Sequence, residues 1–222
     1  MNSITPFWLI VSLIFFSLVP ILIGVCTSYL KINIVVGMLR NGLGTQHAPS
    51  NLVIMVLSLS LSIFIMAPVV ERSLELSDGL FNNVSDKNFS KGFDLKNLKP
   101  VLKPWQDFMQ QQSGSYEIEV LQELAKQHHL SNVLDEENSK NEIPLYILVP
   151  AFLLSELKEA FSMGFIILLP FLVIDLIIAN ILAGMGMYML SPTIISLPIK
   201  LLFFVMSDGW LLLSQSLISS YH

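Results

Sequence analysis

The stretch "FLVIDLIIANILAGMGMYMLSPTIISLPIKLLFF", Phe171–Phe204, decides the architecture of this chain. Two long apolar runs flank a short loop of glycines, alternating methionines and a closing proline. Only Asp175 and Lys200 carry charge within it. Because glycine and proline disfavour a continuous helix, the stretch predicts a hairpin of two apolar helices joined by a loop at residues 184–192.

The composition of the whole chain agrees with this hairpin. Its 222 residues are 53% hydrophobic and only 13% charged, against about 25% charged residues in an ordinary soluble domain. Mean hydropathy is +0.67. A bilayer core is crossed by roughly 20 apolar residues, and four runs reach that length: 6–26, 51–70, 160–183 and 193–219. Without a strand pattern, the fold class is all-α: membrane-type helical hairpins kinked by proline and glycine.

Charge divides the chain into three segments. An apolar hairpin at 1–70 and another at 144–222 flank a polar segment at 71–143. From Glu71 to Glu142 the chain carries 13 acidic and eight basic residues. Within the middle segment, 71–103 has loop composition, apolar residues at helical spacing predict a helix near 104–130, and 131–143 is an acidic linker.

The connector of the first hairpin predicts the orientation. It carries Lys31 and Arg40 and no acidic residue, and short basic connectors favour the cytoplasmic side. The N-terminus and the polar middle segment then lie on the outer side of the membrane, and the 184–192 loop lies on the cytoplasmic side. No basic residue precedes the first apolar run, so we interpret that run as a retained helix rather than a cleaved signal peptide.

The two charges of the C-terminal hairpin match in depth. Asp175 lies 13 residues before Tyr188 and Lys200 lies 12 after it. In antiparallel helices the mismatch is about one or two ångströms at 1.5 Å rise per residue. Because a charge inside a membrane is costly, we expect an ion pair, within one chain or between neighbouring copies. The pair either only holds helices together or serves an ion-coupled role.

Three further charges precede the third apolar run, in "SELKEAF". Glu156, Lys158 and Glu159 follow Pro150. We expect them at a solvated helix end.

The loop itself presents soft side chains. Met185, Met187 and Met189 alternate, with Tyr188 between the last two. Methionine adapts to irregular gaps. In a symmetric oligomer, copies of the loop would form an apolar, deformable ring, and apolar constrictions gate by excluding water. The alternative is a turn packed against lipid or core.

Several chemistries have no basis in the sequence. Cys26 is the only cysteine, so an internal disulfide is excluded. No spacing resembles a metal site, and no cofactor or nucleic-acid motif occurs. An intramembrane enzyme would need a second carboxylate or a Ser/His pair at matched depth, so we expect no enzyme. The remaining rival is a small-solute or ion transporter that uses Asp175 and Lys200 as a coupling site.

Long motifs in a fixed order resemble the FliP/SctR family of export-apparatus proteins of flagellar and virulence type III secretion. They are "TSYLKINIVVGMLRNGLGTQHAPSN", "MAPVVE", "LVPAFLLSELKEAFSMGFIILLPFLVIDLIIANILAGMGMYML" and "SLPIKLLFFVMSDGWLLL". The resemblance implies a non-enzymatic, pore-forming homopentamer in the bacterial inner membrane that conducts unfolded polypeptides. It also implies SctT/FliR-like and SctS/FliQ-like partners and an SctU/FlhB-like switch protein, with the complex extending to the periplasmic side.

The family's methionine gasket falls on Met187, Tyr188 and Met189. The family usually has three methionines in a row there, and this chain has tyrosine in the middle. Met185 is an additional soft side chain beside it. The resemblance also assigns the family's Asp and Lys to Asp175 and Lys200. A start directly at the first helix favours the virulence branch over the flagellar one.

Overall fold

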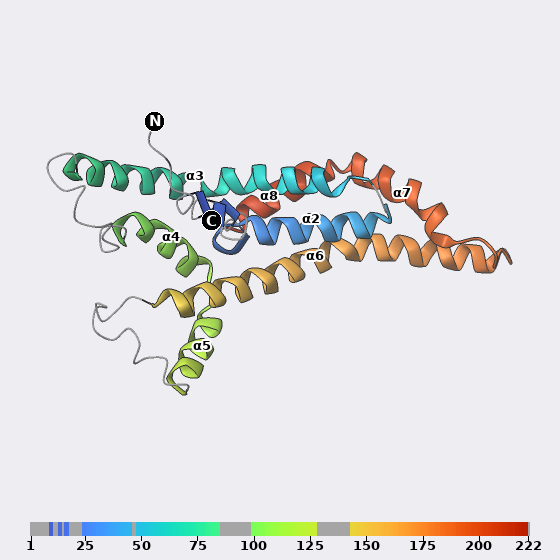
Figure 1. The fold of residues 1–222 in the computed structure, drawn as a ribbon. Coiled ribbons are helices and arrows are strands. Elements are labelled where there is room, and N and C mark those ends of the chain that lie inside the picture. The colour runs from blue at the N-terminus through green and yellow to red at the C-terminus, as the bar shows by residue number, and fades with distance from the viewer. Residues whose placement is uncertain are drawn as a thin grey trace. The chain divides into compact units, whose positions relative to one another are not determined.

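The computed structural model describes residues 9–10, 13–14, 16–17, 24–45, 48–84, 99–127 and 143–221. Most of these residues are helical and none is in a strand, as the sequence predicts. The helices are α2 (Tyr29–Leu43), α3 (Asn51–Val84), α4 (Lys99–Gln112), α5 (Ser115–Gln127), α6 (Leu145–Gly184), α7 (Pro192–Met206) and α8 (Gly209–Ser219) (Figure 1). Most of the predicted N-terminal run at 6–26 and nearly all of the acidic linker at 131–143 lie outside the described residues.

The chain forms two compact units. Unit 1 comprises residues 1–28 and 66–155, and unit 2 comprises 29–65 and 156–222. Neither coincides with one of the three segments that charge suggests, because α3 and α6 each contribute residues to both units. The three-segment division stays a prediction.

Helix α3 is longer than predicted. Residues 71–84 were expected in a loop but continue the helix. The reason is local, since Glu71, Arg72 and Leu74 are strong helix formers and outweigh the polar composition around them. The buried Ser73 also donates its hydroxyl to the Val69 carbonyl at 2.9 Å, which satisfies it within the helix.

The single helix predicted near 104–130 is two helices, α4 and α5. The break lies at Ser113–Gly114, where the Ser113 hydroxyl donates to the Met109 carbonyl at 2.6 Å. The Gly114 amide donates to Ser155 Oγ at 2.8 Å instead of continuing the helix. A tertiary contact therefore satisfies the amide, and no local sequence rule contains that contact.

The core of unit 1 lies between α4 and the first turns of α6. The rings of Phe108 and Phe152 are tilted with centroids 6.0 Å apart. Met109, Leu148 and Ala151 are buried beside them. This is the apolar face of α4 that the i, i+3, i+4 spacing predicts.

Two helices in the described part of the chain are long and apolar enough to cross a membrane: Asn51–Ser77, and all of α6. A third candidate is α7 with α8, if that bent pair counts as one span. Helix α6 has 40 residues, about 60 Å at 1.5 Å per residue, which is twice the roughly 30 Å of a hydrocarbon core. Only part of α6 fits inside a bilayer.

The fourth apolar run, expected to be one helix at 193–219, is broken. Helices α7 and α8 meet at an angle of 63°. Asp208 sits between them with φ of 49°, a left-handed conformation that interrupts a helix. A Cβ at Gly209 would overlap the ring of Phe204, so the bend depends on glycine there.

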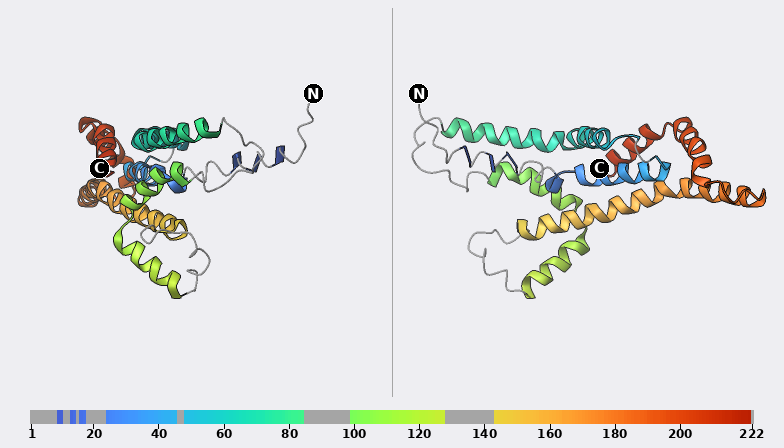
Figure 2. Two further views of the ribbon diagram at one scale, coloured as in Figure 1. Left: turned by 90° about the vertical axis from the view of Figure 1, so that its left-hand side faces the viewer. Right: turned by 45° about the vertical axis from the view of Figure 1, so that its right-hand side comes forward.

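In unit 2, α2 packs along α6, as Figure 1 and the right-hand view of Figure 2 show. Close approach requires glycine on both helices. A Cβ at Gly42 would lie 2.5 Å from Leu168 Cδ2 and 3.1 Å from Phe171 Cδ2. A Cβ at Gly164 of α6 would overlap the Met38 side chain of α2. The buried apolar residues of α2 are Ile32, Val35, Val36, Leu39 and Leu43, and Lys31 of the same helix is buried as well.

Candidate functional site

The α6–α7 turn, residues 185–191, presents the predicted soft side chains to the outside. Met185 is 60% exposed, Met187 44%, Tyr188 81% and Met189 101%. Large apolar side chains are normally buried. The turn therefore offers an unpartnered apolar tip in the single chain.

Helix α6 ends in a Schellman motif, which explains the glycine of the turn. Gly186 adopts φ of 73°, a left-handed conformation. The Met187 amide donates to the Leu182 carbonyl at 2.9 Å, and the Gly186 amide donates to the Ala183 carbonyl at 3.0 Å. These are the two hydrogen bonds of the motif, and glycine is the residue that it prefers at this position. Local chemistry alone thus reverses the chain before Met187–Met189.

Asp175 and Lys200 form an ion pair within one chain. Lys200 Nζ lies 2.6 Å from Asp175 Oδ2. The Ser196 hydroxyl donates to the other carboxylate oxygen at 2.5 Å. The Lys200 side chain is 4% exposed and that of Asp175 29%. Counting residues from the turn predicts this pairing, because both helices rise by the same distance per residue.

Lys200 also reaches a third helix. Its Nζ donates to the Gly42 carbonyl at 3.0 Å, near the end of α2. A helix C-terminus has unsatisfied carbonyls and attracts cations. The lysine thereby joins α2, α6 and α7 at one point. The matched depth of Asn180 and Ser196 does not produce a contact between them, because Ser196 bonds to Asp175 and Asn180 is exposed.

The "SELKEAF" charges do not lie at a helix end, so that part of the expectation is wrong, although Lys158 and Glu159 are exposed to solvent as expected. Glu156, Lys158 and Glu159 lie inside α6, which begins at Leu145. The helix starts earlier because the Pro144 carbonyl accepts its first amides, from Ile147 at 3.0 Å and Leu148 at 2.9 Å. Pro150 is accommodated inside α6. Glu156 is only 1% exposed, so it is a buried charge rather than a solvated one.

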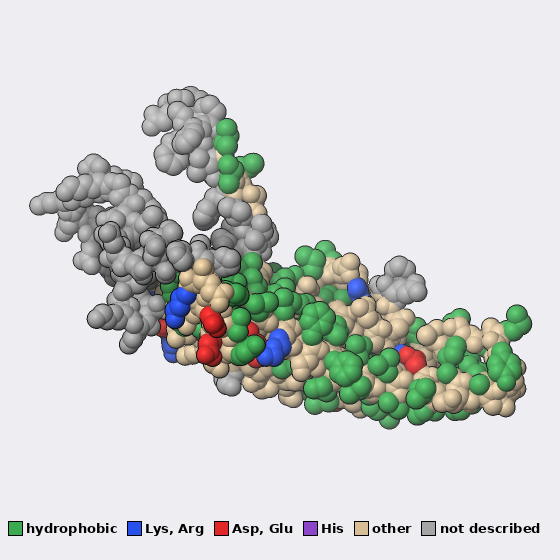
Figure 3. Space-filling model, turned by 90° about the horizontal axis from the view of Figure 1, so that it is seen from below, with side chains coloured by type: hydrophobic (Ala, Val, Ile, Leu, Met, Phe, Trp, Pro, Cys, Tyr) green, Lys and Arg blue, Asp and Glu red, His purple; other side chains and the backbone are tan. Residues whose placement is uncertain are grey.

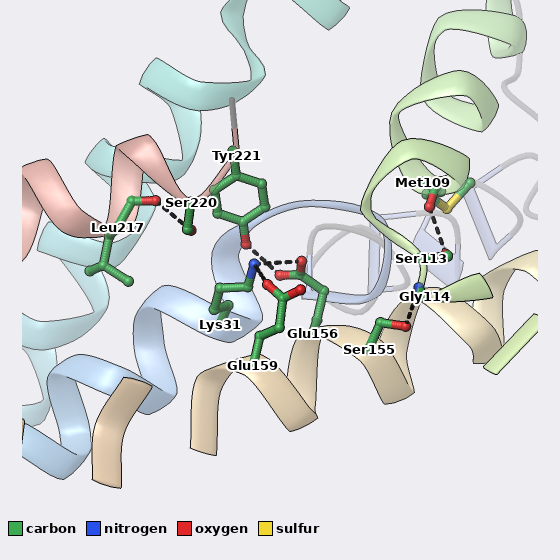
Figure 4. A network of polar contacts seen from close by, with 10 residues as sticks. All are labelled: Lys31, Met109, Ser113, Gly114, Ser155, Glu156, Glu159, Leu217, Ser220 and Tyr221. Carbon is green, nitrogen blue, oxygen red and sulfur yellow. Dashed lines mark hydrogen bonds and ion pairs between the residues drawn. The ribbon is translucent and has the colours of Figure 1, made fainter. Parts of the chain in front are cut away.

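The partner of these carboxylates is Lys31, from α2 (Figure 4). Lys31 is fully buried, and its Nζ lies 3.0 Å from Glu156 Oε1 and 2.6 Å from Glu159 Oε2. The same nitrogen stands 4.0 Å from the ring centroid of Tyr221, a cation–π distance. The Tyr221 hydroxyl donates to Glu156 Oε2. We call these four residues the Lys31 cluster.

Tyr221 remains a neutral donor in this cluster. Burial, and then the negative charge of Glu156, raises the pKa of the Tyr221 hydroxyl far above its usual value. The hydroxyl therefore stays protonated at physiological pH. The cluster joins the chain end after α8 to α2 and α6.

The Lys31 cluster and the Asp175–Lys200 pair lie far apart along α6. Glu156 and Asp175 are separated by 19 residues, about 28 Å along the axis. That distance is close to the roughly 30 Å thickness of a hydrocarbon core. At most one of these two groups of charges can therefore lie at the bilayer centre.

Lys31 and Tyr221 were not among the sequence-predicted site residues. Lys31 was used only to orient the connector. The available signal was a charge imbalance, since Glu156 and Glu159 share a helix face at i, i+3 and their only nearby cation, Lys158, lies off that face. The required cation lies 125 residues earlier, and sequence spacing does not identify it.

Metal chemistry finds no support among the residues that the structure describes, where no group of three or more His, Cys, Asp or Glu side chains could hold an ion. Figure 3 shows instead that apolar side chains cover much of the visible surface toward the α6–α7 turn, on the right, with few charges. Exposed side chains on these helices include Phe165, Ile166, Leu176, Leu202 and Met206. Extensive apolar exposure is typical of lipid or protein contact.

Comparison with known proteins identifies the family. The chain matches the FliP family over residues 12–217. It is 39% identical to the surface presentation of antigens protein SpaP of Shigella flexneri over 222 residues, covering 96% of this chain and 95% of that protein. It is 39% identical to the Yop proteins translocation protein R of Yersinia pestis over 218 residues, with 96% and 95% covered.

A flagellar relative matches equally well. The flagellar biosynthetic protein FliP of Buchnera aphidicola is 40% identical over 217 residues, which are 98% of this chain and 54% of that protein. Since both kinds of relative match at nearly the same identity, the expected assignment to a virulence system stays a prediction. Family match and relatives agree with the motifs: this chain belongs to the FliP family of type III secretion export-apparatus components.

Proposed function

We propose that this chain is a pore-forming, non-enzymatic subunit of a type III secretion export gate in the bacterial inner membrane. In this proposal it forms a homopentamer, as the family resemblance implies. SctT/FliR-like, SctS/FliQ-like and SctU/FlhB-like proteins are its partners, and unfolded polypeptides pass through the ring. The observation that carries the proposal is the α6–α7 turn, whose Met187, Tyr188 and Met189 side chains are exposed without a partner in the single chain.

The side chains of this turn suit a seal around a variable object. Methionine is unbranched and polarisable, and it fills irregular gaps. Tyrosine adds a large apolar body with a polar tip. A ring of such side chains would exclude water when idle, as other apolar constrictions do, and deform around a passing chain. The Schellman end of α6 supports the same proposal because it holds the turn in one backbone conformation.

The Asp175–Lys200 pair would position this seal. It links α6 and α7 about 20 Å from the turn, from the 13 residues between Asp175 and Tyr188. Both charges already have partners. Asp175 accepts from Lys200 and Ser196, and Lys200 also donates to the Gly42 carbonyl. In our proposal the pair is a structural joint of the hairpin rather than a coupling site for transported ions.

The test is leakage of a small solute through the assembled gate. Deletion of residues 187–189, and separately replacement of all three by serine, should raise leakage in vesicles that contain the complex. Met206→Ala is the matched control, because Met206 is 76% exposed but lies outside the turn. Unchanged leakage in an assembled complex of unchanged native mass would refute the sealing role.

The oligomer is tested separately by native mass. The detergent-purified chain should form a discrete pentamer, alone or with the partner subunits. A stable monomer or dimer under both conditions would contradict the pore.

A further inference from the structure

Unit 2 contains an apolar hollow that the proposed pore does not use. It has a volume of about 210 Å³ and lies among α2, the connector before α3, α3 itself and α8. Its lining residues are Val36, Pro49, Val53, Ile54, Leu57, Trp210 and Ser214. An apolar cavity of ~150 Å³ suffices for a benzene-sized guest. The hollow is therefore large enough for several methylene groups.

Trp210 forms one wall of this hollow. Its ring contacts Phe204 edge-on, with centroids 5.2 Å apart, and 41% of the residue remains exposed. Tryptophan is enriched where lipid headgroups meet the hydrocarbon. The Trp210 ring is thus held by Phe204 on one side and remains accessible on the other.

Arg40 lies close in the chain to residues that line the hollow, near the start of α3. Arg40 lies one turn after the lining residue Val36 on α2. Its Nη1 donates to Asn51 Oδ1, and Asn51 is two residues from both Pro49 and Val53 in the lining. The guanidinium is therefore held beside the hollow by contacts on both helices.

The charge of Arg40 is not neutralised within the described part of the chain. Within those residues, the only polar contact of its side chain is with the neutral Asn51 amide, and the first turn of α3 has no acidic residue. The two other cations of unit 2 with resolved ion pairs, Lys31 and Lys200, each have a carboxylate. Unlike these two lysines, Arg40 offers an anion a planar set of hydrogen-bond donors. Arginine binds phosphate through bidentate hydrogen bonds.

We propose that this hollow is a binding site for an anionic phospholipid, with the phosphate on Arg40 and one acyl chain along the apolar lining. The order of charged and apolar residues along the site indicates a lipid as the ligand. Asn51 is the first residue of a candidate membrane span, and Leu57 lies six residues deeper, about 9 Å. A lipid has the same order: charge at the surface, hydrocarbon directly below it.

The surroundings of the hollow also fit a lipid. The α3 side chains next to the lining are exposed and apolar, with Met55 54% and Val56 59% exposed. The lining therefore continues into a surface that a bilayer would cover. Basic residues at membrane ends attract anionic lipids at about 1 kcal/mol each.

The experiment uses Trp210 as a local probe in the full chain. The sequence has three tryptophans, Trp8, Trp105 and Trp210, so Trp8→Phe and Trp105→Phe leave only Trp210. Lipids brominated on the acyl chain quench tryptophan on contact. Quenching should occur at about fivefold lower mole fraction for a brominated phosphatidylglycerol than for the phosphatidylcholine analogue. Both lipids carry a phosphate, but only phosphatidylglycerol has a net negative charge, and fivefold is the ratio expected of one basic residue attracting that charge.

Two variants separate the headgroup from the chain. Arg40→Gln should abolish the preference for the anionic lipid, whereas Arg72→Gln, the only other arginine, should retain it. Val53→Phe should fill the hollow and reduce quenching by both lipids. Inorganic phosphate should not compete, which distinguishes a lipid from a free anion.

Three results would overturn the proposal. They are equal quenching by the two lipids in the parent chain, a preference that survives Arg40→Gln, and absent quenching in a folded oligomer, which would show protein covering the hollow. Helical circular dichroism checks folding. If Arg40→Gln does not fold, the lipid preference of the parent chain is measured at 1 M salt instead. A preference that persists at this salt concentration would contradict the proposal, because it would not arise from an exposed charge contact.

Discussion

Replacing Lys31 by methionine tests whether the Lys31 cluster stabilises unit 2. Methionine keeps the length and apolar stem of lysine but removes the charge. Glu156, which is 1% exposed, would then retain only the Tyr221 hydroxyl as a described donor. Breaking a buried pair by removing one partner costs about 3–5 kcal/mol. We expect the free energy of unfolding of Lys31→Met to fall by that amount.

Removing the carboxylate instead should cost less, and the asymmetry is specific to this geometry. In Glu156→Gln, Lys31 keeps Glu159 at 2.6 Å and the Tyr221 ring at 4.0 Å. Glutamine can still accept from Tyr221. Since no charge is left unpaired, we expect a loss of about 1–2 kcal/mol. The double variant should lose less than the sum of the two, with a coupling of about 1–3 kcal/mol.

The assay is reversible unfolding in detergent, followed by helical circular dichroism. Lys126→Met on α5 is the control, since Lys126 is exposed and such changes usually stay within about 0.5 kcal/mol. If Glu156→Gln destabilised the chain as much as Lys31→Met, or if the two effects simply added, Lys31 would not be compensating Glu156 and the reasoning would fail.

Three further predictions follow from single contacts in unit 2. Gly186→Ala should destabilise the chain by about 1 kcal/mol, because alanine at φ of 73° is strained although space is free; Gly184→Ala, with no positive φ, should not, and equal stabilities would contradict the Schellman end. Lys200→Met should lower the free energy of unfolding by about 1–3 kcal/mol, less than the loss of a fully buried pair, because the Asp175 side chain is 29% exposed. Adding Asp175→Asn in a double variant should recover part of this loss in the same unfolding assay. Gly209→Ala should push the Phe204 ring aside at a cost of about 1–3 kcal/mol and alter Trp210 fluorescence; an unchanged spectrum would argue against the packed bend.

The parts of the fold that follow from neighbouring residues could be predicted. The α6–α7 turn is an example, because the glycines and proline that end one helix and start the next are adjacent in sequence. The Asp175–Lys200 pair is another, because two helices of equal rise that share a turn must place equally distant residues at equal depth. The family likewise follows from motifs, and the comparisons confirm it.

Other features were mispredicted for identifiable reasons. The break at Gly114 depends on Ser155, 41 residues away, and the bend at Asp208 on the fit of Gly209 against Phe204. Composition placed 71–84 in a loop, where helix propensity prevailed. The gasket, the pentamer and the partners stay proposals.

Sequence thus determines that the chain is helical, how apolar its segments are and which residues face each other across a single turn, since these depend on hydrogen bonds and periodicity over a few residues. Tertiary structure decides which buried charges meet. Lys31 and Glu156 lie in helices separated by most of the chain, and their pairing depends on how α2 packs on α6 through Gly42 and Gly164. That packing is a steric fit between distant surfaces, and a desolvated carboxylate is stable only where the fit brings it a cation.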